Sequence, residues 1–246
     1  MAKQEDVSGP PDSRRTAPWV MHQTWADLLF AHWPIPVDVL RRWVPAPLAI
    51  DTFDGTAWLA VTPFRIEGLR ARALPAVPGL SSFPELNVRT YVAAAKPGVY
   101  FFSLDAGNPF AVTFARRIYD LPYFTAEMSA GAFGNGVSYR SRRRSGGAEL
   151  EAFYEPSGDA FRSLPGTLEH FLTERYCLYT VRRGEVSRTD IEHVPWPLQP
   201  ARAEFRRNTM GDQIGIALAT PPPLLHFARR LEVRAGLPRR GRGELT

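Results

Sequence analysis

The segment Glu85-Leu-Asn-Val-Arg-Thr-Tyr-Val92 decides the fold class of this chain, because its polar and apolar residues alternate as they do in a β-strand. Successive side chains of a strand point to opposite faces of its sheet. The period of two therefore predicts one face made of Glu85, Asn87, Arg89 and Tyr91 and another made of Leu86, Val88, Thr90 and Val92. The turn residues Lys96-Pro97-Gly98 and the apolar segment 99–105 follow, so we expect a β-hairpin here.

Short elements are expected along the rest of the chain, since 23 prolines and 19 glycines interrupt it. Apolar residues at helical spacing predict helices at 36–44, 111–119, 167–176 and 221–231. Alternation and apolar runs predict further strands at 57–64, 123–130, 137–140, 150–154 and 177–182. We expect one β-rich α+β domain with mostly antiparallel strands over residues 19–231, after a disordered lead-in at 1–18 and before a basic disordered tail at 232–246.

The composition is that of a globular protein, with 44% of the 246 residues hydrophobic and 22% charged. This balance excludes a disordered chain, a coiled coil and a collagen-like repeat. The single cysteine, Cys177, excludes an internal disulfide framework and a zinc site built from cysteines. No apolar run reaches the roughly 18 residues of a membrane span, and the N-terminal segment lacks the apolar core of a signal peptide. We therefore expect a cytoplasmic protein without a membrane partner.

The net charge of +5 raises the alternative of a nucleic-acid-binding protein. Most of that charge lies at the C-terminus, where six arginines and two glutamates follow residue 228. Solvated charges of a tail explain this excess without a nucleic acid. Nucleic-acid binding is therefore the least favoured of three hypotheses about function.

Sequence motifs of several enzyme classes are absent. The chain has no nucleophile elbow, no HExxH zinc motif, no phosphate-binding P-loop and no dinucleotide-binding glycine motif. Its five histidines are scattered, and no two of them have metal-ligand spacing on one element. We therefore expect neither a metal nor an organic cofactor. Assembly of the chain into a homo-oligomer is left as an open alternative.

Eight segments carry a family resemblance, at residues 29–34, 44–48, 51–58, 83–92, 98–105, 115–123, 168–176 and 193–198. Together they resemble the YqjF-like family, a bacterial family without an assigned function, over residues 20 to 205. That family is grouped with the acetoacetate-decarboxylase-like superfamily. The resemblance implies a cone-shaped, mainly antiparallel β-barrel with a few peripheral helices around a ligand cavity.

The superfamily's decarboxylases carry a segment resembling Gly-Arg-Glu-x-x-Gly-Tyr-Pro-Lys-Lys, whose first lysine forms a Schiff base with a 3-oxo acid. The matching residues of this chain are 115–124. Arg116 and Pro122 agree with the pattern, but Tyr123 stands in place of the reactive lysine and Phe124 in place of its neighbour. This chain therefore differs from the decarboxylases at the residue that forms the Schiff base.

Schiff-base decarboxylation needs a neutral amine, which a protein supplies by desolvating a lysine or by placing a cation beside it. A tyrosine cannot form an imine. The only lysines of the chain are Lys3, in the expected lead-in, and Lys96, in the expected hairpin turn. We therefore expect no lysine-dependent decarboxylase activity.

The resemblance and the strand pattern together select candidate site residues. The family's glutamate falls on Glu85, and its early arginine falls near residues 32–34, where this chain has no arginine. With the polar face of residues 85–92 turned into the barrel, Glu85 is expected to act as a general acid or base and Tyr123 as a hydrogen-bond donor or acid. Ligand binding is expected from Asn87, Arg89, Arg116 and His32, with an arginine clamping a carboxylate.

These residues leave three explanations open. The first, favoured among the hypotheses about function, is a binding barrel for a small organic acid, an oxo acid in particular. The second is a lysine-independent enzyme that performs enolisation, dehydration or aldol-type chemistry on oxo acids through Glu85 and Tyr123. The third is purely structural: buried charges must be paired, so Glu85 with Arg89 or Arg116 would only satisfy the barrel interior.

Overall fold

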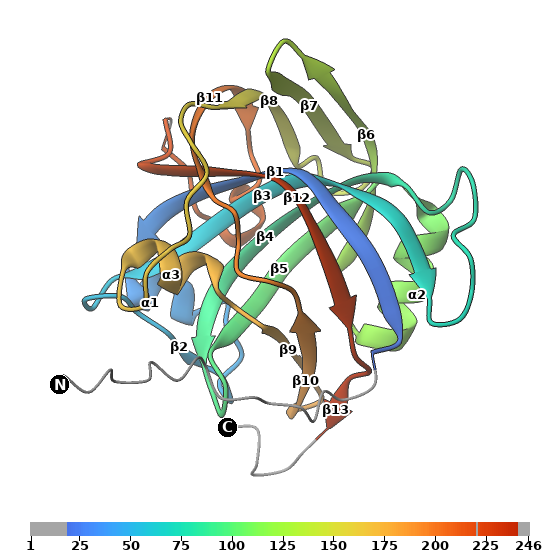
Figure 1. Cartoon of the computed structure of the whole chain (residues 1–246). Coiled ribbons are helices and arrows are strands. Elements are labelled where there is room, and N and C mark those ends of the chain that lie inside the picture. Colours follow the sequence, from blue (N-terminus) through green and yellow to red (C-terminus); the bar gives the residue numbers. More distant parts are fainter. Residues whose placement is uncertain (1–18, 220, 241–246) are drawn as a thin grey trace, which may run out of the picture.

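Strands dominate the computed structural model of this chain, which describes residues 19–219 and 221–240 (Figure 1). The strands are β1 (Met21–Ile35), β2 (Ala49–Ile50), β3 (Ala57–Ala71), β4 (Phe83–Ala93), β5 (Gly98–Ala106), β6 (Tyr123–Phe133), β7 (Gly136–Arg143), β8 (Glu149–Pro156), β9 (Cys177–Arg182), β10 (Glu185–Glu192), β11 (Gln199–Asn208), β12 (Leu224–Ala235) and β13 (Arg239–Arg240). The helices are α1 (Val37–Arg41), α2 (Pro109–Tyr119) and α3 (Leu168–Thr173), with one turn of 3-10 helix at Asp212–Ile214.

Nine strands close into a barrel in the order β5-β6-β7-β8-β11-β12-β1-β3-β4, because β4 pairs back onto β5. Most neighbours are antiparallel, and the exceptions among the described strands are the pairings of β5 with β6 and with β9. Figure 1 shows the helices at the periphery. The expected mainly antiparallel β-barrel with few helices is therefore confirmed.

A second closed circuit of strands shares five of the nine strands of the first. Strands β9 and β10 connect β5 to β12, which gives the order β5-β9-β10-β12-β1-β3-β4. Strand β9 can approach β5 closely because Gly98 lies there, where a Cβ atom would stand 2.8 Å from the carbonyl oxygen of Cys177. The shared strands β12, β1, β3, β4 and β5 consequently have protein on both faces.

Strand β4 shows how this arrangement sorts side chains. Leu86 and Val88 join the hydrophobic core inside the nine-strand barrel. Glu85, Asn87 and Arg89 face the other circuit, and all of these residues are buried. The pairing of β4 with β3 runs without a shift, so the expected alternation is preserved. The expected hairpin with β5 is also confirmed.

Bulges change the alternation on neighbouring strands. In β1, the register with β3 shifts between Ala26 and Ala31, and within this stretch Asp27 has a φ of 52°, in the left-handed region. As a result Trp25 and Leu28, three positions apart, both face the same cavity. The Asp27 carboxylate is fixed by the guanidinium of Arg65 at 2.6 Å.

The C-terminal helix expected at 221–231 is wrong, since residues 224–235 form β12. This strand is buried on both faces: Leu225 and Phe227 pack on one core, whereas Ala228 and Leu231 pack on another. Apolar residues on both faces imitate helical spacing. The expected tail at 232–246 also begins inside this strand, and its last residues, 241–246, lie outside the described residues, as does the expected lead-in at 1–18.

Leu86→Ala is expected to lower the free energy of unfolding by about 2–5 kcal/mol, because Leu86 is fully buried in the barrel core and the substitution leaves a cavity. Urea denaturation measures this change. Leu74→Ala is the matched control, since Leu74 is 61% exposed and the effect there should stay below about 0.5 kcal/mol. Equal losses in the two variants would contradict the assignment of Leu86 to the core.

Candidate functional site

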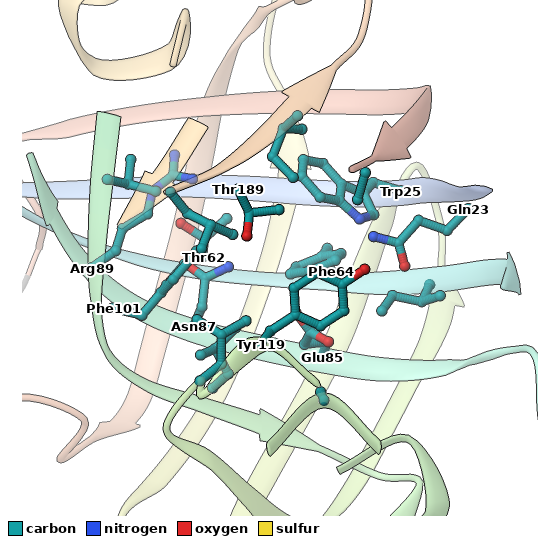
Figure 2. Close-up of a pocket in the computed structure, with 18 of the residues that line it drawn as sticks. Gln23, Trp25, Thr62, Phe64, Glu85, Asn87, Arg89, Phe101, Tyr119 and Thr189 are labelled. Carbon is teal, nitrogen blue, oxygen red and sulfur yellow. The ribbon is translucent and has the colours of Figure 1, made fainter. Parts of the chain in front are cut away.

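A cavity of about 120 Å³ lies on the inner side of the second circuit of strands. Its walls come from β1, β3, β4, β5, β9, β10 and α2, and most of them are apolar or aromatic (Figure 2). Lining side chains include Trp25, Phe30, Phe64, Phe83, Phe101, Leu104, Tyr119 and Trp196. A few polar groups enter this apolar space, which is the usual composition of a ligand site.

Helix α2 covers one end of the cavity, and local sequence signals fix where it starts and stops. The side chain of Asn108 caps it by accepting hydrogen bonds from the amides of Phe110 (2.9 Å) and Ala111 (3.3 Å). Asp120 ends it with a left-handed φ of 52°. Tyr119 donates to the sulfur of Met21 (3.2 Å), which ties the helix to β1 across the cavity.

Arg89 is the charged group at one end of the cavity. Its side chain is 8% exposed. Its guanidinium carbon lies 5.4 Å from the ring centre of Phe30 and 6.0 Å from that of Tyr91. Two of its nitrogens, Nε and one Nη, are buried without a hydrogen bond, and no described carboxylate lies within ion-pair distance of it. Arg89 is therefore a buried cation that lacks an anion.

Asn87 and Thr62 stand directly opposite each other on β4 and β3, next to Arg89. Both line the cavity and are 5% and 1% exposed. The amide oxygen of Asn87 and the hydroxyl of Thr62 are buried without a hydrogen-bond partner. Buried polar groups of folded proteins almost always have such partners. This stretch of the wall is suited to a polar ligand.

Arg175 also reaches the cavity, although its position in the sequence suggests only a helix cap. It does cap α3, donating from Nε to the carbonyl oxygen of Phe171 at 2.6 Å. It also pairs with the carboxylate of Asp51 at 2.6 Å and lies 5.2 Å from the ring centre of Tyr91. The Tyr91 ring thus has a guanidinium near it from each of two arginines, and only Arg175 has a carboxylate.

Glu85 and Tyr123 form the acidic end of the cavity. The tyrosine hydroxyl donates to the Glu85 carboxyl at 2.9 Å, and Tyr139 donates to the backbone oxygen of Glu85 at 2.7 Å. Burial raises the pKa of Glu85 to about 8, against the opposing effect of the Tyr123 hydrogen bond, and the nearby Asp105 raises it further. At neutral pH this carboxyl is therefore mostly protonated.

Two expected ligand-binding residues do not line the cavity. His32 is buried beside Tyr91, with Nε2 2.8 Å from the tyrosine hydroxyl, and burial and the charge of Arg89 lower its pKa. Arg116 is exposed on α2, and its Nε donates to the backbone oxygen of Tyr123 at 2.6 Å. Arg116 was expected to project into the barrel, but the residues of α2 that line the cavity are Ala111, Phe114, Ala115 and Tyr119.

Glu85 also lacks the ion pair that the structural explanation expects. Neither Arg89 nor Arg116 is within ion-pair distance of this carboxyl, whose side-chain partner is Tyr123. The described lysine, Lys96, pairs with Asp190 at 3.7 Å and lies outside the cavity wall. Across residues 19–219 and 221–240, no cluster of three or more histidine, cysteine, aspartate or glutamate side chains could hold a metal ion.

Several residues that line the cavity were not predicted from the sequence. Trp25 and Thr189 belong to β1 and β10, which were not predicted. His193 lines the cavity as well; its Nδ1 lies 2.8 Å from the Val194 carbonyl oxygen, and its ring stacks on Tyr176 at 4.6 Å between ring centres. Among the described helices, none is both long and apolar enough to cross a membrane.

Comparison with known proteins assigns the chain by sequence. Residues 22–232 match the model of the DUF2071 family, described as an uncharacterized conserved protein. The uncharacterized protein YqjF of Bacillus subtilis (strain 168) is 48% identical over 217 residues, which cover 87% of this chain and 90% of that protein. The expected resemblance to this family is confirmed.

Solved structures with the same fold are distant in sequence. The enduracididine biosynthesis enzyme MppR complexed with pyruvate has a TM-score of 0.66 at 13% identity, covering 93% of each chain. An acetoacetate decarboxylase-like enzyme from Sphingomonas wittichii RW1 has a TM-score of 0.64 at 12% identity, covering 98% of this chain and 100% of that one. The acetoacetate decarboxylase of Legionella pneumophila has a TM-score of 0.60 at 12% identity, covering 98% of each chain. These likenesses establish the acetoacetate-decarboxylase-like fold.

The raised pKa of Glu85 predicts how stability depends on pH. Below pH 4.5 the carboxyl is protonated in both the folded and the unfolded chain. Between pH 4.5 and about 8 only the unfolded chain releases the proton, so stability falls as pH rises, by up to about 1.4 kcal/mol per pH unit. Urea denaturation of wild type and Glu85→Gln from pH 5 to 8.5 should show the variant gaining relative stability with pH. A difference that does not vary with pH would contradict the prediction.

Proposed function

We propose that this chain, which belongs to the DUF2071 family, is a small-molecule-binding barrel that takes a small organic acid, in particular an oxo acid, with the carboxylate on Arg89. The single observation that carries this proposal is the buried guanidinium of Arg89 without an anion. Burying an unpaired charge costs several kcal/mol, and a bidentate carboxylate offsets that cost.

Comparison with the other buried arginines supports a ligand role for Arg89. Arg143 pairs with the fully buried Asp105 at 2.7 Å, and Arg175 pairs with Asp51 at 2.6 Å. The fold therefore supplies a carboxylate where an arginine serves the structure. Arg89, with similarly low exposure, lines the cavity without such a carboxylate.

The size and walls of the cavity limit the ligand to a small compound. The free space of about 120 Å³ compares with the roughly 150 Å³ of an engineered apolar cavity that binds benzene. A nucleotide or a coenzyme does not fit this space. That MppR, which shares the fold, is complexed with pyruvate supports an acid of this size.

The residues of the cavity argue against a Schiff base. Tyr123 occupies the position that the family resemblance assigns to the reactive lysine, and it serves as a hydrogen-bond donor to Glu85. Burial and the neighbouring Glu85 carboxyl raise the pKa of its hydroxyl well above the ordinary value, so it stays protonated. An acid would therefore be held through ionic and hydrogen bonds to the side chains of this chain.

Arg89→Met should abolish the stabilisation of the protein by small acids. In wild type, a ligand at about 100 times its dissociation constant adds about 2.7 kcal/mol, which raises Tm by roughly 5–10 °C in a domain of this size. A thermal-shift screen of 2-oxo, 3-oxo and aromatic acids measures the effect. Arg116→Met, which removes an exposed arginine outside the cavity, is the control and should retain it. Absence of any shift in a cooperatively melting wild type would refute the proposal.

A second candidate function, proton transfer on a bound oxo acid, is favoured by the Glu85–Tyr123 pair. A carboxyl with a pKa of about 8 exists in both protonation states near that pH, as a general acid–base group requires. The ionised form would accept a proton from the carbon next to the oxo group, and the C–H electron pair would form the enolate. Protonated Glu85 would then return the proton, while Tyr123 keeps its hydrogen bond.

Glu85→Gln is expected to slow solvent deuterium exchange at that carbon by roughly 100- to 10,000-fold. Proton NMR of a bound oxo acid in deuterium oxide measures the rate for both proteins. Tyr123→Phe should slow it less, because the carboxyl that moves the proton is retained. Exchange at the uncatalysed rate in wild type would leave ligand binding as the function and remove the catalytic candidate.

A further inference from the structure

The acidic and the basic group of the cavity stand at its two ends. Glu85 and Arg89 lie on the same face of β4, four residues apart, and β4 pairs with β3 without a break from Phe83 to Thr90. At about 3.3 Å per residue the two positions are roughly 13 Å apart. Figure 2 shows Arg89 at one side of the cavity, Glu85 toward the other, and Asn87 between them.

The Arg89 guanidinium and the Glu85 carboxyl have different neighbours, as expected for groups at opposite ends of the cavity. The Arg89 guanidinium lies beside the rings of Phe30 and Tyr91. The Glu85 carboxyl is held by Tyr123 instead. The two groups form no ion pair, and the charged group that influences the pKa of Glu85 is Asp105. Each end of the cavity therefore offers its polar group independently to a ligand.

The wall between the two ends combines polar and apolar side chains. Asn87 lies at mid-length, with Thr62 opposite it on β3 and Leu104 opposite it on β5. The ring of Phe64 comes from the residue opposite Glu85, and that of Phe101 from the residue opposite Arg89. Side chains on one face of a strand project roughly in parallel, so the tips of Glu85 and Arg89 keep a separation similar to that of their backbones. After about 3 Å for a hydrogen bond at each end, on the order of 7 Å remains for the ligand.

A 2-oxo acid is too short for this distance. Its oxo group is on the carbon next to the carboxylate, so with the carboxylate on Arg89 the oxo oxygen would reach Asn87 but not Glu85. We propose that the cavity selects acids whose oxo group is separated from the carboxylate by two or three carbons, so that Arg89 binds the carboxylate and Glu85 donates a hydrogen bond to the oxo oxygen. This inference rests on the proposed function and specifies its ligand class.

Three acids with the same five-carbon chain test the inference: pentanoate, 2-oxopentanoate and 4-oxopentanoate. Their dissociation constants are measured by isothermal titration calorimetry at pH 7. Wild type should bind 4-oxopentanoate at least tenfold more tightly than either of the others. Glu85→Leu should reduce this preference to within about threefold, whereas Glu85→Gln, which still donates a hydrogen bond, should retain most of it.

The outcomes separate the inference from the function on which it rests. If the three acids bind wild type equally, or if 2-oxopentanoate binds most tightly, the length selection is wrong while acid binding on Arg89 stands. A preference for 4-oxopentanoate that persists in Glu85→Leu also overturns it. If none of the three acids binds, both the inference and the proposed function fail. Arg89→Met, which should lose binding of all three, shows that the measured binding uses the cavity.

Discussion

The pairing of β10 with β12, through Ile191 with Ala235 and Glu192 with Arg234, closes the second circuit of strands. Without this closure, one face of β1, β3, β4 and β5 would be open to water. With it, the face that carries Glu85, Asn87 and Arg89 is removed from solvent, and every polar group on that face needs a partner inside the molecule. The chemical character of the cavity follows from this closure more than from any one side chain.

Burial has opposite consequences for the two charged groups of the cavity. A carboxyl can escape the cost of desolvation by holding its proton, and the raised pKa of Glu85 shows this response. A guanidinium cannot, because arginine stays charged in proteins. The asymmetry leaves the interior with a positive charge at one end and a neutral proton donor at the other. Such a field favours an anionic ligand with an acceptor atom at its far end.

The parts of the structure that could be predicted are those in which local pattern and burial agree. The alternation of β4 was readable because its register with β3 has no shift, and it led correctly to Glu85, Asn87 and Arg89 in one cavity. Strand β1 was not readable, since an irregularity near Asp27, where the register with β3 shifts, breaks its period. Whether Arg116 turns inward or outward depends on how α2 sits on the barrel, which is a tertiary property that residue spacing does not contain.

The two faces of β4 also bear on how the chain finds its correct pairing during folding. A slip of one residue against β3 would exchange the faces and move three polar side chains into the apolar barrel core, while Leu86 and Val88 would replace them in the cavity. Most antiparallel strands lose only an apolar face to water when they slip. Here the penalty would be the burial of a guanidinium, a carboxyl and an amide among leucines and valines. The polar groups that are suited to a ligand thus also destabilise the slipped register of β4 relative to the native one. A variant whose cavity is wholly apolar would lose this energetic difference between the two registers.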